Sequence, residues 1–339
     1  SIYSLQDRRG SVNRQHYINI KISMKRYIKI LAPVLLGFFF IYLTVNITTS
    51  EERLLIWSYI KSAKIEFVIA AMMFGAFADV IRGLRWRFLA KASGHSSNSL
   101  VSIASVFMCY SSNLIITRSG EIIRATVLSG YNKIPLGKTF GTIAAERVID
   151  MTISFIILIL IWILQYETII ESFFDDNFFF YIEDNISYII GLVLAILIIT
   201  SIVLVKINSV KKFFLSIVEG LLSLAKLNRD FPLFILSTLV IWAFYFTAFY
   251  MIKFSIVEFS IIPAELIFPA FVVSVFSISL SNHGLGVYPL AISLFLLEFN
   301  INTEIGLAYG WLAWSCQAII TLIIGGLSFF VLPLLNSSD

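Results

Sequence analysis

Three groups of ionisable side chains lie within or beside strongly apolar stretches of this 339-residue sequence. The first group follows Asp79 and contains Arg82 and Arg85, which are three residues apart and therefore share one face of a helix. Asp79 is expected to pair with Arg82. Charged groups at membrane depth are costly, so each is a hypothesis of function by default. Two interpretations are open: a positively charged anchor at the membrane surface, or a contact to lipid phosphate.

The second group runs from Asn113 through Arg118, Glu121 and Arg124. The last three are spaced three apart, on one helical face. The Ser-Gly pair at 119–120 breaks the chain, and its serine is expected to cap the next helix, whose free N–H groups would face an anion. Two guanidinium groups around a carboxylate form a self-neutralised site that could accept phosphate. A structural network of ion pairs is the alternative.

The third group, Glu146, Arg147 and Asp150, opens a strongly apolar run. Glu146 and Asp150 are four residues apart and lie on one helical face. Arg118, Arg124 and Arg147 are their expected partners. A hydrogen-bonded network between helices is one interpretation, and a site that couples transport to a proton or another ion is the other.

A polar break with two glycines separates two apolar segments at residues 279–289. Such breaks in membrane bundles often mark binding sites built from half-helices. His283 could titrate near neutral pH, although a lone histidine is more often a hydrogen-bonded structural residue. Gly284 and Gly286 would permit close approach of the backbone or a hinge.

The composition identifies the class of protein that must position these groups. Hydrophobic residues make up 58% of the chain and charged residues 14%, whereas soluble domains have about 45–50% and about 25%. This excludes a soluble globular enzyme, a disordered protein and a secreted disulfide scaffold. The net charge of +4 is too small to indicate nucleic-acid binding. Cys109 and Cys316 lie in apolar runs and read as buried hydrophobic residues, and with no Cys/His cluster we expect neither metal nor cofactor.

The sequence predicts an all-α, polytopic integral membrane bundle with about seven or eight spans, at about 20 residues per span. We expect residues 1–23 to be a non-native or disordered extension before Met24. Residues 24–335 then form a single transmembrane domain, and 336–339 a tail. The predicted spans are 28–47, 63–81, 151–165, 186–205, 231–252, 264–281 and 305–332.

The distribution of charge predicts a re-entrant segment. The basic flank of the first span and the arginines after residue 81 should face the cytoplasm, and the loop at 48–62 and the six-acid stretch at 166–185 should lie outside. If residues 100–117 crossed once, five basic residues at 118–147 would be external. Eighteen residues cannot cross twice as helices, so we infer that 100–117 enters and returns on one side. Residues 284–297 are a second re-entrant candidate.

These motifs resemble a known family. The stretch from Asn113 to Asp150, including Gly141-Thr-Ile-Ala-Ala-Glu-Arg, is similar to the flippase-like family of bacterial membrane proteins, the lysylphosphatidylglycerol synthase transmembrane region. Arg82-Gly-Leu-Arg-Trp and the segments at 283–291 and 306–314 are similar to its other motifs. The likeness covers residues 24 to about 333. Thr117 stands where the family has proline, and Asn282-His283 where a glycine-rich approach is expected.

The resemblance implies the translocating half of such proteins without the aminoacyl-transferase domain that some members carry. We expect a protein of the bacterial cytoplasmic membrane, with its N-terminus inside, that moves or handles an aminoacylated, glycosylated or phospho-lipid between leaflets. No catalytic constellation is visible, so an enzyme is not expected. Expected partners are membrane lipids and a separately encoded lipid-synthesising enzyme, with no nucleic acid. The candidate headgroup-binding residues are Arg82, Arg85, Asn113, Arg118, Glu121, Arg124, Glu146, Arg147, Asp150, His283, Gly284 and Gly286.

In this hypothesis Arg118 and Arg124 bind phosphate, while the neighbouring carboxylates hold the arginines or bind a cationic headgroup. Two other functions remain open. A membrane-embedded lipid-modifying transferase would need an external acidic pair, such as residues 51–52 or 175–176. A non-transporting scaffold would use the charges only for folding.

Overall fold

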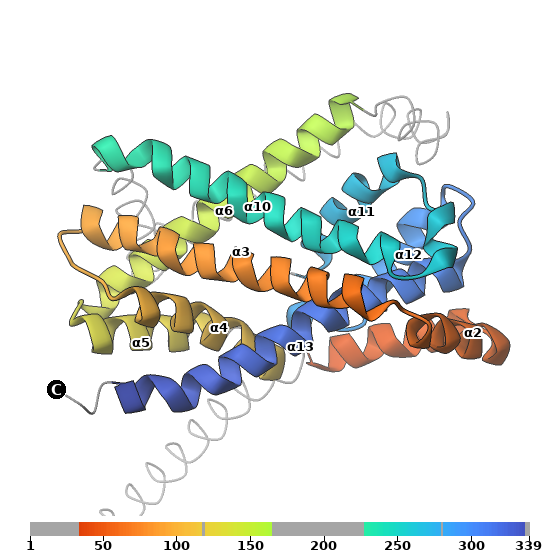
Figure 1. Cartoon of the computed structure of the whole chain (residues 1–339), viewed down its shortest axis with the longest axis horizontal. Helices are drawn as coiled ribbons and strands as arrows, with labels where there is room; N and C mark the ends of the chain where they lie inside the picture. Colours follow the sequence, from red (N-terminus) through yellow and green to blue (C-terminus); the bar gives the residue numbers. More distant parts are fainter. Residues whose placement is uncertain (1–33, 117–118, 165–226, 279–280, 336–339) are drawn as a thin grey trace, which may run out of the picture.

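The computed structural model describes residues 34–116, 119–164, 227–278 and 281–335. Every regular element within these ranges is a helix, and the helices pack side by side along the long axis of the molecule (Figure 1). The predicted membrane helical bundle is therefore confirmed as a fold class. The predicted extension at 1–23, the acidic stretch at 166–185, the span at 186–205 and the tail at 336–339 lie outside the described residues.

Three described helices are long and apolar enough to cross a membrane: α3 (Ile65–Ala92), α10 (Phe231–Met251) continued by the short helix η2 (Ile252–Phe254), and α13 (Thr303–Leu335). A helix at Val34–Ile47 and α2 (Ser50–Lys61) are bent by 113° to each other, and would add one span if they form a broken one. α6 (Leu136–Leu164) is as long as α3 but carries charges in its first half. The predicted count of seven or eight spans stays a prediction.

The predicted external loop at 48–62 is wrong in one respect, because most of it is the helix α2. Thr49 and Glu52 form a capping box at its start: the Thr49 hydroxyl accepts from the Glu52 N–H at 3.2 Å, and the Glu52 carboxylate accepts from the Thr49 N–H at 2.6 Å. Glu51 in the first turn and Lys61 in the last complement the helix dipole.

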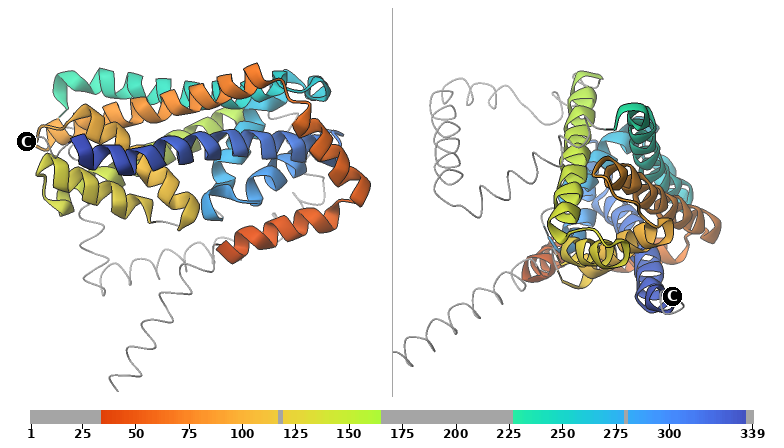
Figure 2. Two further views of the ribbon diagram at one scale, coloured as in Figure 1. Left: turned by 60° about the horizontal axis from the view of Figure 1, so that its bottom comes forward. Right: turned by 90° about the vertical axis from the view of Figure 1, so that its left-hand side faces the viewer.

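α3 is the central helix of the bundle, and α10 packs along it in the opposite direction. Phe67 near the start of α3 meets Phe254 just after α10, and Phe74 meets Phe244, with 5.7 Å between ring centroids in both pairs. α13 also packs against α3, and Figure 2 shows it running along the bundle. These three long helices run along the bundle, and shorter helices pack against them.

α4 (Ser99–Ile115) and α5 (Gly120–Asn132) form an antiparallel hairpin that stops halfway along the bundle. At the open end of the hairpin the Asn98 N–H, just before α4, donates to the amide oxygen of Asn132 at the end of α5, at 2.8 Å. At about 1.5 Å per residue neither helix reaches the roughly 30 Å of a bilayer core. The chain therefore returns to the side it came from, but the prediction for 100–117 needs a correction: α4 is the entering leg only, and α5 is the return.

A second hairpin comes from the opposite end of the bundle. It consists of α11 (Ala264–Ser277), the short turn η4 (Asn282–Gly284) and α12 (Val287–Leu297). The full span predicted at 264–281 is wrong, since α11 has 14 residues. The re-entrant element expected at 284–297 is the returning leg of this hairpin. Both hairpins meet by their tips, where the rings of Tyr110 on α4 and His283 lie 5.9 Å apart.

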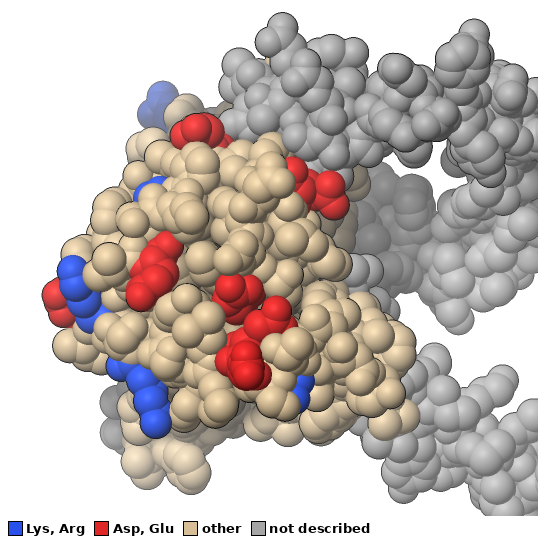
Figure 3. All heavy atoms as spheres, turned by 90° about the vertical axis from the view of Figure 1, so that its right-hand side faces the viewer, with Lys and Arg blue, Asp and Glu red and all other residues tan. Residues whose placement is uncertain are grey.

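The two ends of the bundle differ in charge. Exposed basic side chains gather where α3 and α5 end and α6 and α10 begin, and among the described residues of that end they face one carboxylate, Asp230. They are Arg87, Lys91, Lys133, Lys138 and Arg229. The opposite end carries most of the described surface carboxylates (Figure 3). The exposed ones are Glu51, Glu66, Glu258, Glu265 and Glu298, and the exposed basic residues of this end are Lys61 and Lys64.

Candidate functional site

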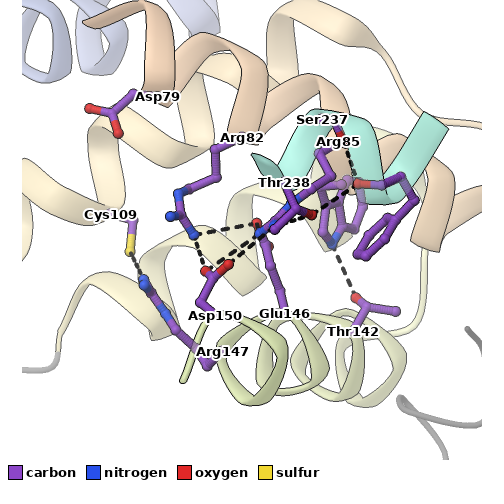
Figure 4. A network of polar contacts seen from close by, with 12 residues as sticks. Asp79, Arg82, Arg85, Cys109, Thr142, Glu146, Arg147, Asp150, Ser237 and Thr238 are labelled. Atoms are coloured by element: carbon purple, nitrogen blue, oxygen red, sulfur yellow. Dashed lines mark hydrogen bonds and ion pairs between the residues drawn. The ribbon is translucent and has the colours of Figure 1, made fainter. Parts of the chain in front are cut away.

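Two arginines of α3 and two carboxylates of α6 form the centre of the charged network (Figure 4). The Arg85 guanidinium lies 2.8 Å from a Glu146 oxygen and 3.1 Å from an Asp150 oxygen. Arg82 also donates a hydrogen bond to Asp150. The spacing of three on α3 and of four on α6 presents each pair on one helical face. The first and third sequence groups are therefore one site, which the sequence did not reveal.

Burial rules out the surface-anchor interpretation for these arginines. Arg82 is 4% exposed and Arg85 0%, and both lie among apolar helices with their charges compensated by carboxylates. Of the three arginines of this segment only Arg87 is exposed, at the basic end of the bundle. The neighbouring Trp86 is also buried, and its indole N–H donates to the Thr142 hydroxyl at 3.1 Å.

α5 and α10 complete the inner network. Arg124 on α5 is 1% exposed and lies 2.9 Å from the second Glu146 oxygen. Thr238 on α10, also fully buried, accepts a hydrogen bond from Arg85 at 2.9 Å. Three guanidinium groups thus surround two carboxylates. We call the five charged residues the inner network, and they are Arg82, Arg85, Arg124, Glu146 and Asp150.

Several polar atoms of the inner network lack a hydrogen bond within the described part of the chain. They are Nε of Arg85, Nε and Nη2 of Arg124, and Oε2 of Glu146. Arg124 and Glu146 attract each other at 2.9 Å, but their atoms are not aligned for a hydrogen bond. Each unsatisfied buried group costs about 1–3 kcal/mol. A network selected only for stability would satisfy them, so the site has unused capacity to bind polar groups.

A second pair of charges lies at the edge of the network. Glu121 on α5 and Arg147 on α6 are 3.3 Å apart, with 32% and 30% of their side chains exposed. The Asn113 amide is 3.4 Å from both Glu121 oxygens. Although Glu121 and Arg124 share a helix, they bind different partners, which corrects the expectation that Arg124 brackets Glu121. We call Glu121 and Arg147 the outer pair; the amide of Asn113 lies beside it.

The cap of α5 differs from the prediction. The Ser119 hydroxyl donates to the carbonyl oxygens of Ile116 and Ser112, at 2.7 Å and 3.1 Å, and caps no N–H group. Asn113 takes that role from the neighbouring helix, because its amide oxygen accepts from the Gly120 N–H at 2.8 Å. A side chain at position 120 would overlap the Cys109 carbonyl, so glycine permits the contact between α4 and α5. Arg118, the remaining residue of this group, lies outside the described residues.

The glycine-bearing break meets the outer pair through Tyr110. The Arg147 guanidinium lies 5.5 Å from the centre of the Tyr110 ring, whose other neighbour is His283. His283 adopts a positive φ of 52°, and its carbonyl accepts from the Trp314 indole at 2.9 Å. Gly284 and Gly286 also have positive φ, 82° and 74°.

Gly286 fulfils the expectation of close backbone approach. A Cβ there would lie 2.7 Å from the Gly37 carbonyl oxygen. The turn between α11 and α12 is therefore held against the helix at Val34–Ile47 on one side. On its other side it contacts α4 through Tyr110.

Asp79 does not pair with Arg82 as predicted. Its carboxylate accepts from the Tyr245 hydroxyl at 2.5 Å and from the Gln317 amide at 3.4 Å. Among the described residues it has no ion pair within 4 Å. Tyr110, Thr238, Tyr245 and Gln317 escaped sequence reasoning. Their signal is weak, because neutral polar side chains recur along these apolar helices and nothing local marks the ones that face the charges.

All ion pairs of the inner network and of the outer pair join residues between positions 82 and 150. α3, α5 and α6 thus hold the charges. α4 and α10 add neutral polar groups. Among the described residues no group of three or more His, Cys, Asp or Glu side chains has the arrangement of a metal site.

Comparison with known proteins places this site in a family. The family model of the lysylphosphatidylglycerol synthase TM region matches residues 30–325. The chain is 34% identical over 95 residues to UPF0104 membrane protein MJ1595 of Methanocaldococcus jannaschii, covering 26% of this chain and 27% of that protein. It is 26% identical over 136 residues to Glycosyltransferase AglD of Haloferax volcanii, covering 40% and 21%.

The chain thus spans about a quarter of the length of these two relatives. No solved structure matches it. The family model, in contrast, covers every element that contributes to the inner network and the outer pair. The protein therefore belongs to the family described as the lysylphosphatidylglycerol synthase TM region.

Proposed function

We propose that the protein moves or handles a polar lipid between the two leaflets of a membrane, with the headgroup passing the outer pair and the inner network. The headgroup would be aminoacylated, glycosylated or a simple phosphate ester. The observation that carries the proposal is a nearly neutral cluster of charges near the meeting point of two opposed hairpins. Its inner network is buried, and the side chains of its outer pair are about one-third exposed. Such a cluster can replace water around a charged headgroup while the acyl chains remain in lipid.

Each part of the cluster has a distinct role in this proposal. The outer pair is the entrance, because Glu121 and Arg147 retain about a third of their surface and can exchange their mutual contact for an ammonium and a phosphate. Arg124 and Arg85 lie deeper, and each has N–H groups without a hydrogen bond to the residues that the structure describes, which can donate to phosphate oxygens. Their carboxylate partners keep these arginines neutralised when no lipid is bound.

The charge asymmetry of the bundle supports an orientation for the proposal. The end with Arg87, Lys91 and Lys133 would face the cytoplasm, following the positive-inside tendency. Lys133→Cys and Glu258→Cys test this, since both positions are exposed and belong to opposite ends. In sealed cells a membrane-impermeant maleimide should label only position 258. Labelling of position 133 alone would reverse the orientation.

The transferase alternative receives no specific support from the described residues. Of its two candidate acidic pairs, the one at 175–176 lies outside the described residues, and the one at 51–52 begins α2. There Glu52 is engaged in the capping box with Thr49. The scaffold alternative predicts that the charges matter for folding alone, and the following experiment separates it from transport.

The proposal is tested by leaflet exchange of headgroup-labelled phosphatidylglycerol, phosphatidylethanolamine and a glycolipid in vesicles containing the purified protein. Glu121→Gln and Arg147→Gln change the outer pair, which is too exposed to dominate folding. Lys91→Ala is the matched control, because it breaks a solvent-exposed ion pair with Asp230, 2.6 Å long, at the end of the bundle.

We expect exchange of at least one lipid with the wild type and the control, and exchange at the rate of protein-free vesicles with both outer-pair variants. Equal exchange in all four proteins would remove the outer pair from the path. No exchange of any lipid by the wild type would favour the scaffold.

A further inference from the structure

Among the described residues near the inner network, Asp79 carries the one carboxyl group that the proposed lipid path does not use. It is 0% exposed, and Arg82, one turn further along α3, is bound to Asp150 instead. Buried ionised carboxylates are normally paired with a cation. Here the compensation consists of two neutral donors, the Tyr245 hydroxyl at 2.5 Å and the Gln317 amide at 3.4 Å.

The helices around Asp79 are shaped to make these two contacts. Gly75 lies one turn before Asp79 on α3, and a side chain there would overlap the amide oxygen of Gln317. The absence of a Cβ therefore lets Gln317 of α13 reach across α3 to the carboxylate. Tyr245 reaches it from α10 on the other side. Asp79 thus joins the three long helices of the bundle.

Asp79 is linked to the inner network by one hydroxyl group. Tyr245 donates to Asp79 and accepts from Nε of Arg82 at 3.4 Å, with the Arg82 guanidinium 5.6 Å from its ring centre. A proton on Oδ1 of Asp79, which faces Tyr245, would turn that oxygen into a donor, and the Tyr245 proton cannot point toward Arg82 instead, because arginine only donates. A proton on Oδ2, which faces Gln317, would leave Oδ1 as an uncharged and weaker acceptor. In both cases the hydrogen bond of Tyr245 to Asp79 changes, and with it the contact between Tyr245 and Arg82.

The charged groups that face Asp79 are all on the side of the inner network. α13 contributes only the neutral Gln317, and α10 contributes Tyr245. The facing cations are Arg82, Arg124 and Arg147. Asp150 binds Arg82, Glu146 binds Arg124 and Glu121 binds Arg147, so the carboxylate of Asp79 receives only distant compensation from these cations. One proton neutralises it without breaking any of these ion pairs.

We propose that Asp79 is a proton-binding site whose occupancy is transmitted to Arg82 through Tyr245, so that lipid movement is coupled to a proton gradient. The coupling rests on the proposed function. The binding of the proton does not, since it depends only on the burial of Asp79 and on its two neutral donors. In each cycle one proton would add to the carboxylate and one would leave.

The proton site is tested first without lipid transport. Infrared difference spectra of the purified protein between acidic and alkaline pH should contain a carbonyl band of a protonated, buried carboxylic acid. That band should disappear in Asp79→Asn and shift in Tyr245→Phe, which removes the donor. Glu258→Gln is the control, because this carboxylate is exposed at the end of the bundle, and the band should persist. A band unchanged by Asp79→Asn, or no band at all, overturns the proposal.

The coupling is tested by lipid exchange in vesicles with an imposed pH gradient and a clamped membrane potential. The gradient should change the wild-type rate about fivefold or more and leave Asp79→Asn unaffected. An equal response of both proteins overturns the coupling. If the wild type exchanges no lipid at all, the proposed function fails, while the infrared result still decides whether Asp79 binds a proton.

Discussion

Removing one carboxylate from the inner network tests how firmly its charges depend on one another. Asp150→Asn keeps the size of the side chain but removes the charge that binds both Arg82 and Arg85. Three guanidinium groups would then share the single carboxylate of Glu146. Breaking a buried ion pair on one side costs about 3–5 kcal/mol. We expect the free energy of unfolding to fall by that amount.

The assay is reversible unfolding in mixed micelles, with increasing mole fraction of sodium dodecyl sulfate and helicity followed by circular dichroism. Lys91→Ala provides the scale for a surface ion pair. Its side chain is 73% exposed, and such pairs contribute about 0–1 kcal/mol. The difference between the two variants measures the effect of burial.

A double-mutant cycle separates the interaction from unrelated effects of each substitution. Arg85→Gln and Asp150→Asn together should cost at least about 1 kcal/mol less than the two single changes added, because the residues contact each other. A loss in Asp150→Asn no larger than in Lys91→Ala would refute the reasoning. Exact additivity of Arg85→Gln and Asp150→Asn would show that the two charges do not interact.

Three further substitutions test the packing, the cap and a buried hydrogen bond, all in the same unfolding assay. Gly120→Ala should lower the free energy of unfolding by about 1–3 kcal/mol, because its Cβ would overlap a carbonyl of α4. The control Gly130→Ala has open space around it and should be neutral or stabilising. Equal effects of the two substitutions would mean that α4 and α5 lie further apart than the structure shows. Asn113→Ala should cost about 0.5–2 kcal/mol as the lost cap of α5, and more than Ser119→Ala; the reverse order would restore Ser119 as the cap. Tyr309→Phe removes a buried hydrogen bond of 2.7 Å to the Phe249 carbonyl and should cost about 0.5–1.5 kcal/mol; an unchanged stability would mean that water replaces it.

The sequence predicted the class of fold and the need for a returning segment well. Composition alone required a membrane bundle, and the positive charges after residue 81 required residues 100–117 to return. It could not show which element returns. A helix after residue 119 was predicted, but its charges did not indicate that it is the returning leg inside the bundle. Arg124 can be buried there because the Glu146 carboxylate pairs with it.

The partners within the site were less predictable. Spacing correctly placed Arg82 with Arg85, and Glu146 with Asp150, on common faces. Which face meets which helix depends on packing over 60 or more residues of sequence, as for Arg85 and Glu146. Local spacing also misassigned Asp79, since its true partners, Tyr245 and Gln317, come from helices far along the chain. His283 was found by its glycine neighbours, but its contact with Tyr110 had no local signal.

Within the described parts of the chain, the ion pairs of the inner network and the outer pair are confined to residues 82–150, and this has a consequence for biosynthesis. A ribosome delivers α3, α5 and α6 before it has made α10 or α13. The arginines and carboxylates of the inner network can therefore neutralise one another early, while most of the C-terminal half is still untranslated. Asp79 differs, because Tyr245 and Gln317 arrive much later. Until α10 and α13 are made, the Asp79 carboxyl has neither of these donors, so these later helices complete a site that α3 begins.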